Sequence, residues 1–407
     1  MAVAMKDIIP TLSTVYSIST RALQRNITPF NDVTSVAGMS YSLSETITEN
    51  INGSTDYTSY LENIPYPREL KKFPLWEIIV KTLFYVIVIV LATAGNCLVI
   101  AVVYTNTRMQ TTTNFYIVNL AASDLLVTLS CSWVHLVSSL NEDWVLGAFF
   151  CKFNSFAQVT STVSSILTLT VIACDRFFGI VFALKAHIAE RRAWYAIVLL
   201  WIIAIVVAAP LLYVRRLFMT KWANHTERFC TDDWTLVTNS MNAMKARRIY
   251  YTFVSIVLFF VPVLVMSLAY AMIIWKLWSA QIPGERLETE NRNQLRVKRK
   301  IVLMLMMILA AFVICWLPYQ ISILYSEYRS AGVATPLEPW FDNFYYISLF
   351  IAYANSAINP VIYAGFNDNF KKGVRNLFHC RRKRSLYMGM ESSRTESFHS
   401  STMVTKV

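Results

Sequence analysis

Charged residues are scarce in this chain of 407 residues, because Asp, Glu, Lys and Arg make up only 15% of it while 55% is hydrophobic. So little charge cannot cover a water-soluble surface of this size, which excludes an ordinary soluble protein. Runs of about 20 apolar residues can cross a bilayer as helices. Seven such runs are present: residues 76–104, 113–139, 149–174, 193–213, 249–275, 301–325 and 341–364. The sequence therefore predicts an all-α membrane protein, a bundle of seven transmembrane helices with its termini on opposite sides.

Catalytic motifs and internal repeats are also missing. Neither HExxH nor GxSxG occurs, which argues against a peptidase or other membrane enzyme. The spans show no internal repeat, which argues against a transporter. A soluble basic domain is absent too, and the net charge of +12 lies in clusters at span ends. This placement favours contact with anionic membrane lipid and argues against nucleic acid.

The basic clusters set the expected orientation. They lie at residues 185–192, 292–300 and 371–384, which all fall on one side of a seven-span bundle. By the positive-inside rule that side is cytoplasmic, so the amino terminus is expected outside and the carboxy terminus inside. The pairs Lys71-Lys72 and Arg215-Arg216 run against this rule.

Three N-x-Ser/Thr acceptors for glycosylation, at Asn26, Asn52 and Asn224, all fall on the expected extracellular side. Residues 1–75 are rich in Ser, Thr and Asn and poor in apolar periodicity, so we expect a disordered, glycosylated tail. A cleavable signal peptide is not evident there, and the first span is expected to serve as the signal.

Three of the seven cysteines differ from the buried thiols expected within spans. Cys151 opens the third span and Cys230 lies in the loop after the fourth, both in the oxidising compartment, so they can pair and tether that loop. Cys380 lies beside four basic residues past the last span, which suits palmitoylation at the inner membrane surface. A plain reduced thiol is the alternative for Cys380.

Polar residues inside the spans need partners. An ionisable group at the bilayer centre costs about 3 kcal/mol, so Asp124 in LAASDLLV needs polar partners inside the bundle. The side chains that can supply it are Asn96, Ser165, Asn355 and Asn359. Such a seam could bind a small cation, conduct ions or hold a switch, although polar residues between helices are also simple packing contacts.

Four prolines, Pro210, Pro262, Pro318 and Pro360, fall within or near the ends of spans. Each removes a backbone hydrogen bond and favours a kink. We interpret Asn355, Asn359 and Pro360 as residues tolerated where a helix changes shape between two states, with polar neighbours satisfying the freed carbonyls.

Motifs of one family occur in order along the chain: GNCLVI, LAASD, WVLGAFFC, CDRF, Trp201, Pro262, Tyr270, FVICWLPY and NPVIY. Over residues 76–380 the chain resembles a rhodopsin-like (class A) G-protein-coupled receptor. The resemblance implies a bundle over residues 76–365, an amphipathic membrane-surface helix over 366–380 and a cytoplasmic tail over 381–407. It also implies a disulfide between Cys151 and Cys230.

The resemblance also assigns roles in switching. Arg176, next to Asp175, is expected to engage the G protein once span six swings outward, assisted by Tyr270 and Tyr363. A packed trio, Ile166, Pro262 and Phe312, links the ligand cavity to that motion, with Trp316 as the aromatic floor. Pro360 is also counted among the switch residues.

A sodium pocket that favours the resting state is implied at four positions: Asp124, Ser165, Asn355 and Asn359. The chain departs from the family at Phe177, where tyrosine is usual, at Ala183, where many members have proline, and at Lys298, where some members carry the acid that locks Arg176. An ionic lock to span six is therefore not expected.

The ligand is narrowed by elimination. Residues 341–364 contain no lysine, which excludes a retinal Schiff base, and Gln158 stands where amine receptors have aspartate. A neutral amide there resembles receptors of the neuropeptide Y, neuropeptide FF and orexin kind. Gln158, Gln320 and Tyr319 are expected to hydrogen-bond a peptide amide above a floor formed by Trp316. Alternatively, Gln158 and Gln320 satisfy each other.

Acidic residues gather where the cavity mouth is expected, and we assign four of them to ligand binding: Glu227, Asp232, Asp233 and Glu327. The hypothesis is that they attract a basic residue of the peptide. A solvated acidic rim is the alternative.

Serines and threonines between residues 392 and 402 are candidate phosphorylation sites for arrestin capture, and Thr405–Val407 resembles a PDZ ligand. The predicted function is a cell-surface neuropeptide receptor that activates heterotrimeric G proteins through a two-state change. The alternatives are a class A receptor for a non-peptide ligand and a membrane transporter or channel.

Overall fold

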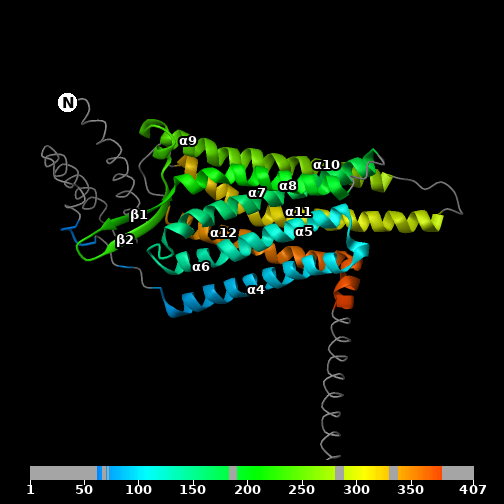
Figure 1. The fold of residues 1–407 in the computed structure, drawn as a ribbon, viewed down its shortest axis with the longest axis horizontal. Coiled ribbons are helices and arrows are strands. Elements are labelled where there is room, and N and C mark those ends of the chain that lie inside the picture. Colours follow the sequence, from blue (N-terminus) through cyan, green and yellow to red (C-terminus); the bar gives the residue numbers. More distant parts are fainter. Residues whose placement is uncertain are drawn as a thin grey trace, which may run out of the picture.

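The structure is a computed structural model that describes residues 62–66, 70, 73–182, 190–279, 288–329 and 338–377. Within these ranges seven helical stretches are long and apolar enough to cross a membrane, which confirms the predicted bundle. Figure 1 shows them running side by side, with a β-hairpin at one end and the helix that follows α12 at the other. We call these the hairpin end and the Arg176 end of the molecule.

Five spans are single helices: α4 (Leu75–Thr105), α7 (Gly147–Val181), α8 (Glu190–Val214), α11 (Glu288–Arg329) and α12 (Pro339–Phe366). Each extends beyond its predicted apolar run at both ends, by one residue for α4 and by more than three turns before the run for α11. Hydropathy marks the hydrocarbon-crossing part of a helix and not its caps. A short 3₁₀ turn, η1 (Thr107–Met109), joins α4 to the second span.

The second and fifth spans each contain a π-helical segment. In the second, η2 (Thr128–Ser132) separates α5 (Thr112–Val127) from α6 (Trp133–Leu140). In the fifth, η4 (Phe253–Phe260) separates α9 (Ser240–Thr252) from α10 (Val261–Ser279). Wider turns of this kind often lie at functional sites. Nothing in the hydropathy of these runs predicted them.

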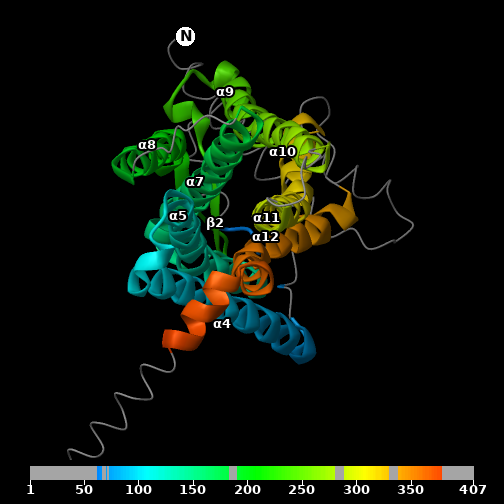
Figure 2. The same ribbon diagram turned by 90° about the vertical axis from the view of Figure 1, so that its right-hand side faces the viewer.

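The third span, α7, contacts α5, α8, α10 and α11, and the end view in Figure 2 shows it among the other helices. Hydrogen bonds join α5, α7 and α8 inside the apolar interior. The Asn119 amide donates to Thr168 Oγ1 (2.8 Å) and its oxygen accepts from Trp201 Nε1 (2.7 Å). Because these hydrogen bonds join side chains of three helices inside the apolar interior, they fix the three helices in register.

The first and seventh spans approach each other closely at Gly95. A Cβ atom at this position would lie 2.7 Å from both Cβ and Cγ of Pro360. The neighbouring Asn96 is fully buried and donates to the backbone oxygen of Ser356 (2.9 Å). The glycine thus allows α4 to reach the backbone of α12 where Pro360 interrupts its hydrogen bonding.

The hairpin consists of β1 (Arg215–Lys221) and β2 (Thr226–Asp232), paired antiparallel with Leu217 opposite Cys230. The predicted all-α fold did not include this hairpin. Residues 62–66 lie against its turn, because Tyr66 N donates to Asn224 Oδ1 (2.7 Å) and Ala223 N donates to the Ile64 oxygen (2.9 Å). A short 3₁₀ turn, η3 (Trp234–Leu236), leads from the hairpin toward α9.

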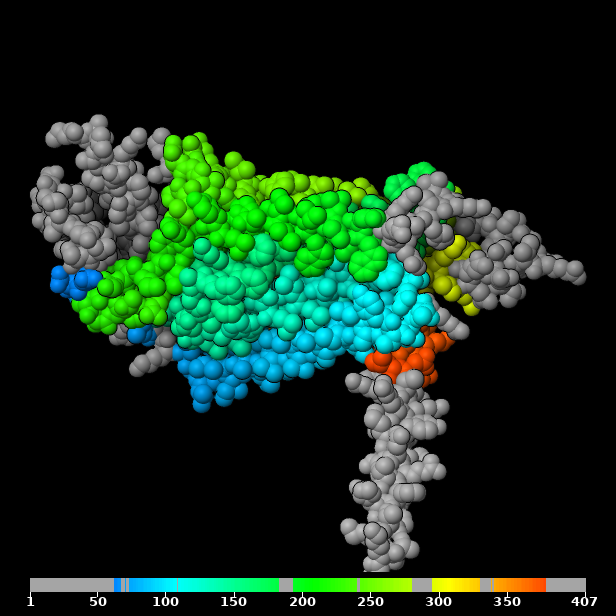
Figure 3. Space-filling model, in the orientation of Figure 1, coloured from blue at the N-terminus to red at the C-terminus, as the bar shows by residue number. Residues whose placement is uncertain are grey.

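A helix over residues 368–377 follows α12 at the Arg176 end. Asn367 caps it, since its side-chain oxygen accepts from Phe370 N (3.0 Å). Gly373 packs so closely on the first span that a Cβ there would lie 2.5 Å from Val102 Cγ1. Figure 3 shows this segment at the opposite end of the body from the hairpin. The predicted helix over 366–380 therefore begins two residues later, and its last residues lie outside the described part.

Candidate functional site

A cavity of about 890 Å³ opens among the helices at the hairpin end. Its lining includes four of the eight residues predicted to bind ligand, namely Gln158, Trp316, Tyr319 and Gln320. The other four, Glu227, Asp232, Asp233 and Glu327, do not line it. Aromatic side chains form much of the wall, which is typical of a pocket for a largely apolar ligand with a few polar anchors.

Gln158 lies on α7 in the polar part of the cavity wall. Its amide nitrogen donates to Tyr319 Oη (2.8 Å), and its oxygen accepts from Tyr353 Oη (2.9 Å). Gln320 is bonded elsewhere, with its oxygen accepting from Ser255 Oγ (2.9 Å). The alternative that the two glutamines satisfy each other is therefore wrong, and Gln158 instead joins α7, α11 and α12.

Below these groups an aromatic column follows α11 away from the cavity. The Trp316 ring lies 6.1 Å from that of Tyr319 and 6.0 Å from that of Phe312, and Phe312 lies 6.0 Å from Phe259. Ile166 belongs to the same buried core cluster as these rings, and Pro262 is buried on α10. In a close-packed interior, movement of one ring requires its neighbours to move, so the column can carry a displacement from the cavity into the bundle.

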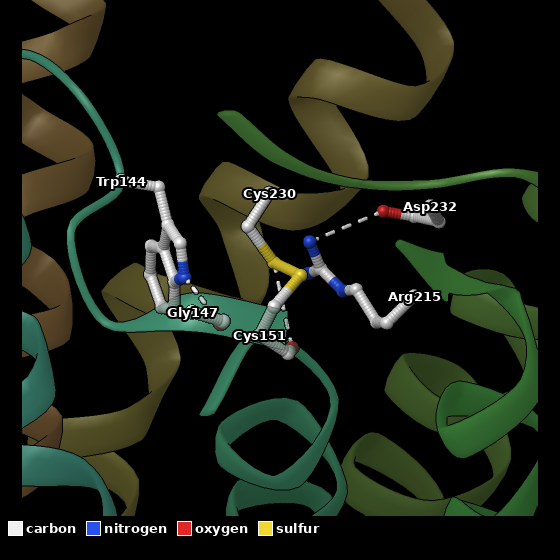
Figure 4. Close-up of a disulfide and its surroundings, with 6 residues drawn as sticks. All are labelled: Trp144, Gly147, Cys151, Arg215, Cys230 and Asp232. Carbon is white, nitrogen blue, oxygen red and sulfur yellow. Dashed lines mark hydrogen bonds and ion pairs between the residues drawn. A yellow bond between two sulfur atoms is a disulfide. The ribbon is translucent and has the colours of Figure 1, made fainter. Parts of the chain in front are cut away.

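The disulfide between Cys151 and Cys230 forms at the edge of the cavity, which confirms the predicted pair. It fastens β2 to the first turns of α7 (Figure 4). Arg215 lies beside it and reaches Asp232 (Nη1 to Oδ1, 3.4 Å), and Trp144 Nε1 donates to the Gly147 oxygen (2.8 Å). The disulfide thus fixes the hairpin at the edge of the cavity, where Arg215 and Cys230 form part of the lining.

Two of the predicted acidic contacts, Glu327 and Asp232, share Arg247 as a partner. Glu327 accepts from Arg247 (Nη2 to Oε1, 2.8 Å), and Asp232 lies 3.5 Å from Arg247 Nε as well as near Arg215. Burial alone would raise the pKa of the Asp232 carboxyl, but the charges of Arg215 and Arg247 outweigh it and hold that pKa well below its usual range.

The other two acids lie nearer the hairpin surface. Asp233 faces Arg216 at 3.7 Å, and Glu227 accepts from Trp222 Nε1 at 3.4 Å. The four predicted acids do not form a rim that faces only solvent, because each of them has a partner within the chain.

The polar seam predicted around Asp124 is assembled at mid-bundle. Asp124 Oδ2 accepts from Asn359 Nδ2 (2.7 Å), and Oδ1 accepts from Ser356 Oγ (3.1 Å). Ser165 and Asn355 are buried in the same way as these groups. Among the described residues, the side-chain oxygens of Asn355 and Asn359 have no hydrogen-bond partner, so further polar acceptors are available in the seam.

At the other end of α7, Arg176 is held by its neighbours. It donates to Asp175 Oδ2 (Nη2, 2.5 Å) and to Thr113 Oγ1 (2.6 Å), which ties α7 to α5. Lys298 on α11 is exposed. Tyr270 and Tyr363, predicted to assist Arg176, are both buried, and the Tyr363 ring lies 6.4 Å from that of Phe370.

Comparison with known proteins decides the family. Residues 95–363 match the family described as 7 transmembrane receptor (rhodopsin family). The chain belongs to the rhodopsin family of seven-transmembrane receptors. It is accordingly a multi-pass plasma-membrane receptor and not an enzyme.

Relatives of this receptor carry peptide-receptor names. It is 36% identical to a QRFP-like peptide receptor of Branchiostoma floridae over 313 residues, which cover 74% of this chain and 78% of the relative. It is 27% identical to the human substance-P receptor, covering 82% and 80% of the two chains. A neuromedin-K receptor of Oryctolagus cuniculus is 30% identical over 75% of this chain and 62% of its own length.

Several contacting residues of this receptor were missed from the sequence. Ser356 bonds Asp124, Tyr353 bonds Gln158, and Arg247 bonds Glu327. Ser356 follows Asn355 directly, and a small hydroxyl in an apolar run is a weaker signal than the two amides beside it. Arg247 lies in a short basic stretch before the fifth apolar run, which gives no indication that it contacts Glu327. The predicted sites at Asn26, Asn52, Cys380 and Thr405–Val407 lie outside the described residues.

Proposed function

We propose that this chain is a cell-surface receptor that binds an extracellular peptide in the cavity at the hairpin end and activates heterotrimeric G proteins at the Arg176 end. Family membership and the peptide-receptor names of its relatives support this proposal. The observation that carries it is the Gln158 site, where an amide lies at the junction of α7, α11 and α12 inside an aromatic cavity.

A peptide suits this chemistry because its backbone and terminal amides offer donors and acceptors together. Gln158 can exchange its bonds to Tyr319 and Tyr353 for bonds to such an amide, and the ligand then also has to supply partners for the two freed tyrosine hydroxyls. The tyrosines sit on different helices, so this exchange alters the contacts between α11 and α12. A ligand that makes these contacts better in one helix arrangement shifts the population toward it.

The proposed orientation places the hairpin outside and the helix over 368–377 inside. The disulfide at the hairpin needs an oxidising compartment, and the basic residues near the Arg176 end need a cytoplasmic one. Asn224 is exposed at the hairpin turn, and a glycan acceptor has to be accessible in this way. Glycosylation at Asn26 and Asn52, palmitoylation at Cys380 and capture by arrestin or PDZ proteins stay predictions.

Signal output is proposed to start from release of Arg176. In the resting arrangement its guanidinium is committed to Asp175 and Thr113. When span six moves outward, the aromatic column that ends at Phe312 repacks, and Arg176 becomes available to the G protein with Tyr270 and Tyr363 as neighbours. No acid on α11 opposes this movement at Lys298, so we expect measurable basal activity.

A sodium ion is proposed to stabilise the resting arrangement at Asp124, Ser165, Asn355 and Asn359. The residues fit such an ion, because Asp124 supplies a buried carboxylate and the Asn355 and Asn359 oxygens lack partners among the described residues. Hard cations prefer oxygen ligands of this kind. When bound, the ion neutralises the carboxylate inside the membrane.

The test is peptide-evoked G-protein activation in cells that express the receptor, using a panel of carboxy-amidated and free-acid neuropeptides. Arg176→Ala should abolish activation while leaving surface expression and peptide binding intact. Gln158→Ala should lower potency at least tenfold, whereas Arg216→Ala, an exposed arginine of the hairpin, should not. A ligand-evoked current or uptake with no G-protein signal would sink the proposal.

A further inference from the structure

Arg215 places a charged side chain in the wall of the cavity. It is the first residue of β1, and it lines the cavity beside Cys230 of the disulfide (Figure 4). Its neighbour Arg216 is 52% exposed, pairs with Asp233 and is not part of the lining. Successive side chains of a strand point to opposite faces. The alternation therefore brings the first arginine of the pair to the cavity and leaves the second on the hairpin surface.

Much of the hydrogen-bonding capacity of the Arg215 guanidinium is unused. The group carries N–H donors on three nitrogens. Among the described residues its only ion partner is Asp232, whose Oδ1 lies 3.4 Å from Nη1. That is longer than a direct hydrogen bond between charged groups, which measures about 2.7–2.9 Å. The Nε atom is buried and has no hydrogen-bond partner in the described part of the chain. Because a buried donor without an acceptor is costly, the site favours a ligand that supplies one.

Asp232 does not depend on Arg215 for its charge balance. It accepts from Tyr251 Oη (3.0 Å) and from Trp234 Nε1 (3.1 Å), and it lies 3.5 Å from Arg247 Nε. A ligand carboxylate that competes for Arg215 therefore has to replace one long contact, and it leaves Asp232 with its nearest partners. The same reasoning makes substitution of Arg215 tolerable for the fold.

The other charged residues in the wall of the cavity differ from Arg215. Lys81 on α4, the second cation of the lining, is paired with Glu77 at 2.6 Å. Two further acids belong to the lining, Glu142 in the segment between α6 and α7 and Asp342 in the first turn of α12. Arg215 is thus the cation of the lining that is only loosely paired.

A carboxylate suits an arginine in this position. Its two oxygens accept parallel N–H···O bonds from the guanidinium fork, and these bonds are short and strong because both groups are charged. Rotation of the Arg215 side chain toward such a carboxylate also gives Nε the acceptor that it lacks. Tyr319, which bonds Gln158, lines the same cavity and lies within electrostatic range of the guanidinium. One ligand can therefore place an amide at Gln158 and a carboxylate at Arg215.

We propose that Arg215 is the anion-binding residue of the cavity and that it binds a carboxylate of the peptide, either a free carboxy terminus or the side chain of an Asp or Glu. The ligand class is then a peptide with an acidic group close to the amide that Gln158 binds. This assignment deepens the proposed function and rests on it. The charge expected on the ligand differs from the basic residue predicted from the sequence, because the four acids behind that prediction do not line the cavity, whereas Arg215 does.

The first test needs no peptide. Purified receptor is titrated with hippurate, which combines an aromatic ring, an amide and a carboxylate, and thermal unfolding is followed. The neutral hippuramide at equal ionic strength is the reference compound. We expect a saturable rise in Tm with hippurate alone for the parent and for Arg216→Gln, and none for Arg215→Gln.

Two variants control this experiment. Arg216→Gln is the matched control, because it removes the same charge one residue away on the hairpin surface. Arg215→Lys keeps the charge beside Asp232 but lacks the planar fork, so it should respond less than the parent, and it keeps the test valid if Arg215→Gln is poorly expressed. A response of the parent no larger than that of the Arg215 variants would overturn the site.

The second test identifies the acidic group of the ligand. In the most potent acid-containing peptide of the panel, the carboxy terminus is amidated and each Asp or Glu is replaced by Asn or Gln, one change at a time. We expect one change to lower potency at the parent at least tenfold, equivalent to about 1.4 kcal/mol, and to have little effect at Arg215→Gln. The change that does so distinguishes a terminal from a side-chain carboxylate.

Two results of this second test would contradict the assignment. One is an equal loss of potency at the parent and at Arg215→Gln, and the other is activation of the parent only by peptides without an acidic group. Failure of the proposed function would appear differently, as no response of the parent receptor to any peptide of the panel.

Discussion

Replacing Gly95 by alanine tests the contact between the first and seventh spans. The new methyl group would lie 2.7 Å from two ring carbons of Pro360, although ordinary contacts begin at 3.4 Å. The proline ring is fixed to its own backbone and cannot rotate away, so α4 or α12 must shift. Overpacking of this kind destabilises by about 1–3 kcal/mol.

A matched substitution separates this strain from the helix-forming preference of alanine. Gly179 on α7 has nothing within 4 Å of a Cβ, so Gly179→Ala should show only the gain of about 1 kcal/mol for replacing glycine in a helix. Gly95→Ala should therefore be less stable than Gly179→Ala by about 1–3 kcal/mol. Thermal unfolding of the two purified, ligand-free variants measures the difference.

The shift of α4 or α12 should also affect the polar seam around Asp124. Asn359 precedes Pro360 and bonds Asp124 at 2.7 Å, so movement of α12 at the proline weakens that bond. We expect Gly95→Ala to change basal G-protein activation as well as stability. If Gly95→Ala unfolds at or above the temperature of Gly179→Ala, the close approach described above does not exist and the reasoning fails.

Three further predictions follow from contacts elsewhere. Cys151→Ser or Cys230→Ser should lower stability by about 4 kcal/mol through the loop that the bond closes, and the double variant should be no worse than either, as thermal unfolding would reveal. Asn119→Ala leaves Trp201 Nε1 without its acceptor, while the Thr168 hydroxyl keeps its bond to the Ser164 oxygen, and should destabilise by about 1–3 kcal/mol, more than Trp201→Phe does. Because the pKa of Asp232 is depressed in the folded receptor, its contribution is present above the ordinary aspartate value of about 4 and is lost only as the pH falls below it. The Tm difference between the parent and Asp232→Asn should therefore stay constant from pH 7 to about 5 and shrink in stronger acid.

The sequence predicted the spans and the membrane-buried polar residues because both depend on local composition. Asp124 and Asn359 stand out as polar residues in apolar runs. The cost of burying a carboxylate is enough to predict that Asp124 has a polar partner, and Asn359 is that partner. The disulfide was predictable for a similar reason, since few cysteines lie on the outer side.

Pairings between distant charges were not predictable in the same way. Glu327 and Arg247 are 80 residues apart, and nothing in either segment marks the other as its partner. From its charge alone, Glu327 was predicted to attract a basic ligand. In the structure Glu327 is buried and already paired with Arg247 of the same chain. The hairpin likewise depends on the pairing of residues 215–221 with residues 226–232, which composition does not encode.

The π-helical segments η2 and η4 have a consequence for comparing this receptor with its relatives. A single wide turn accommodates one extra residue, and one residue corresponds to about 100° of rotation around a helix axis. Side chains beyond such a turn, including His135 on the second span and Arg247 on the fifth, therefore face directions that depend on whether a relative has the same insertion. Ligand contacts near the mouth should be transferred between these proteins by superposition and not by counting along an alignment.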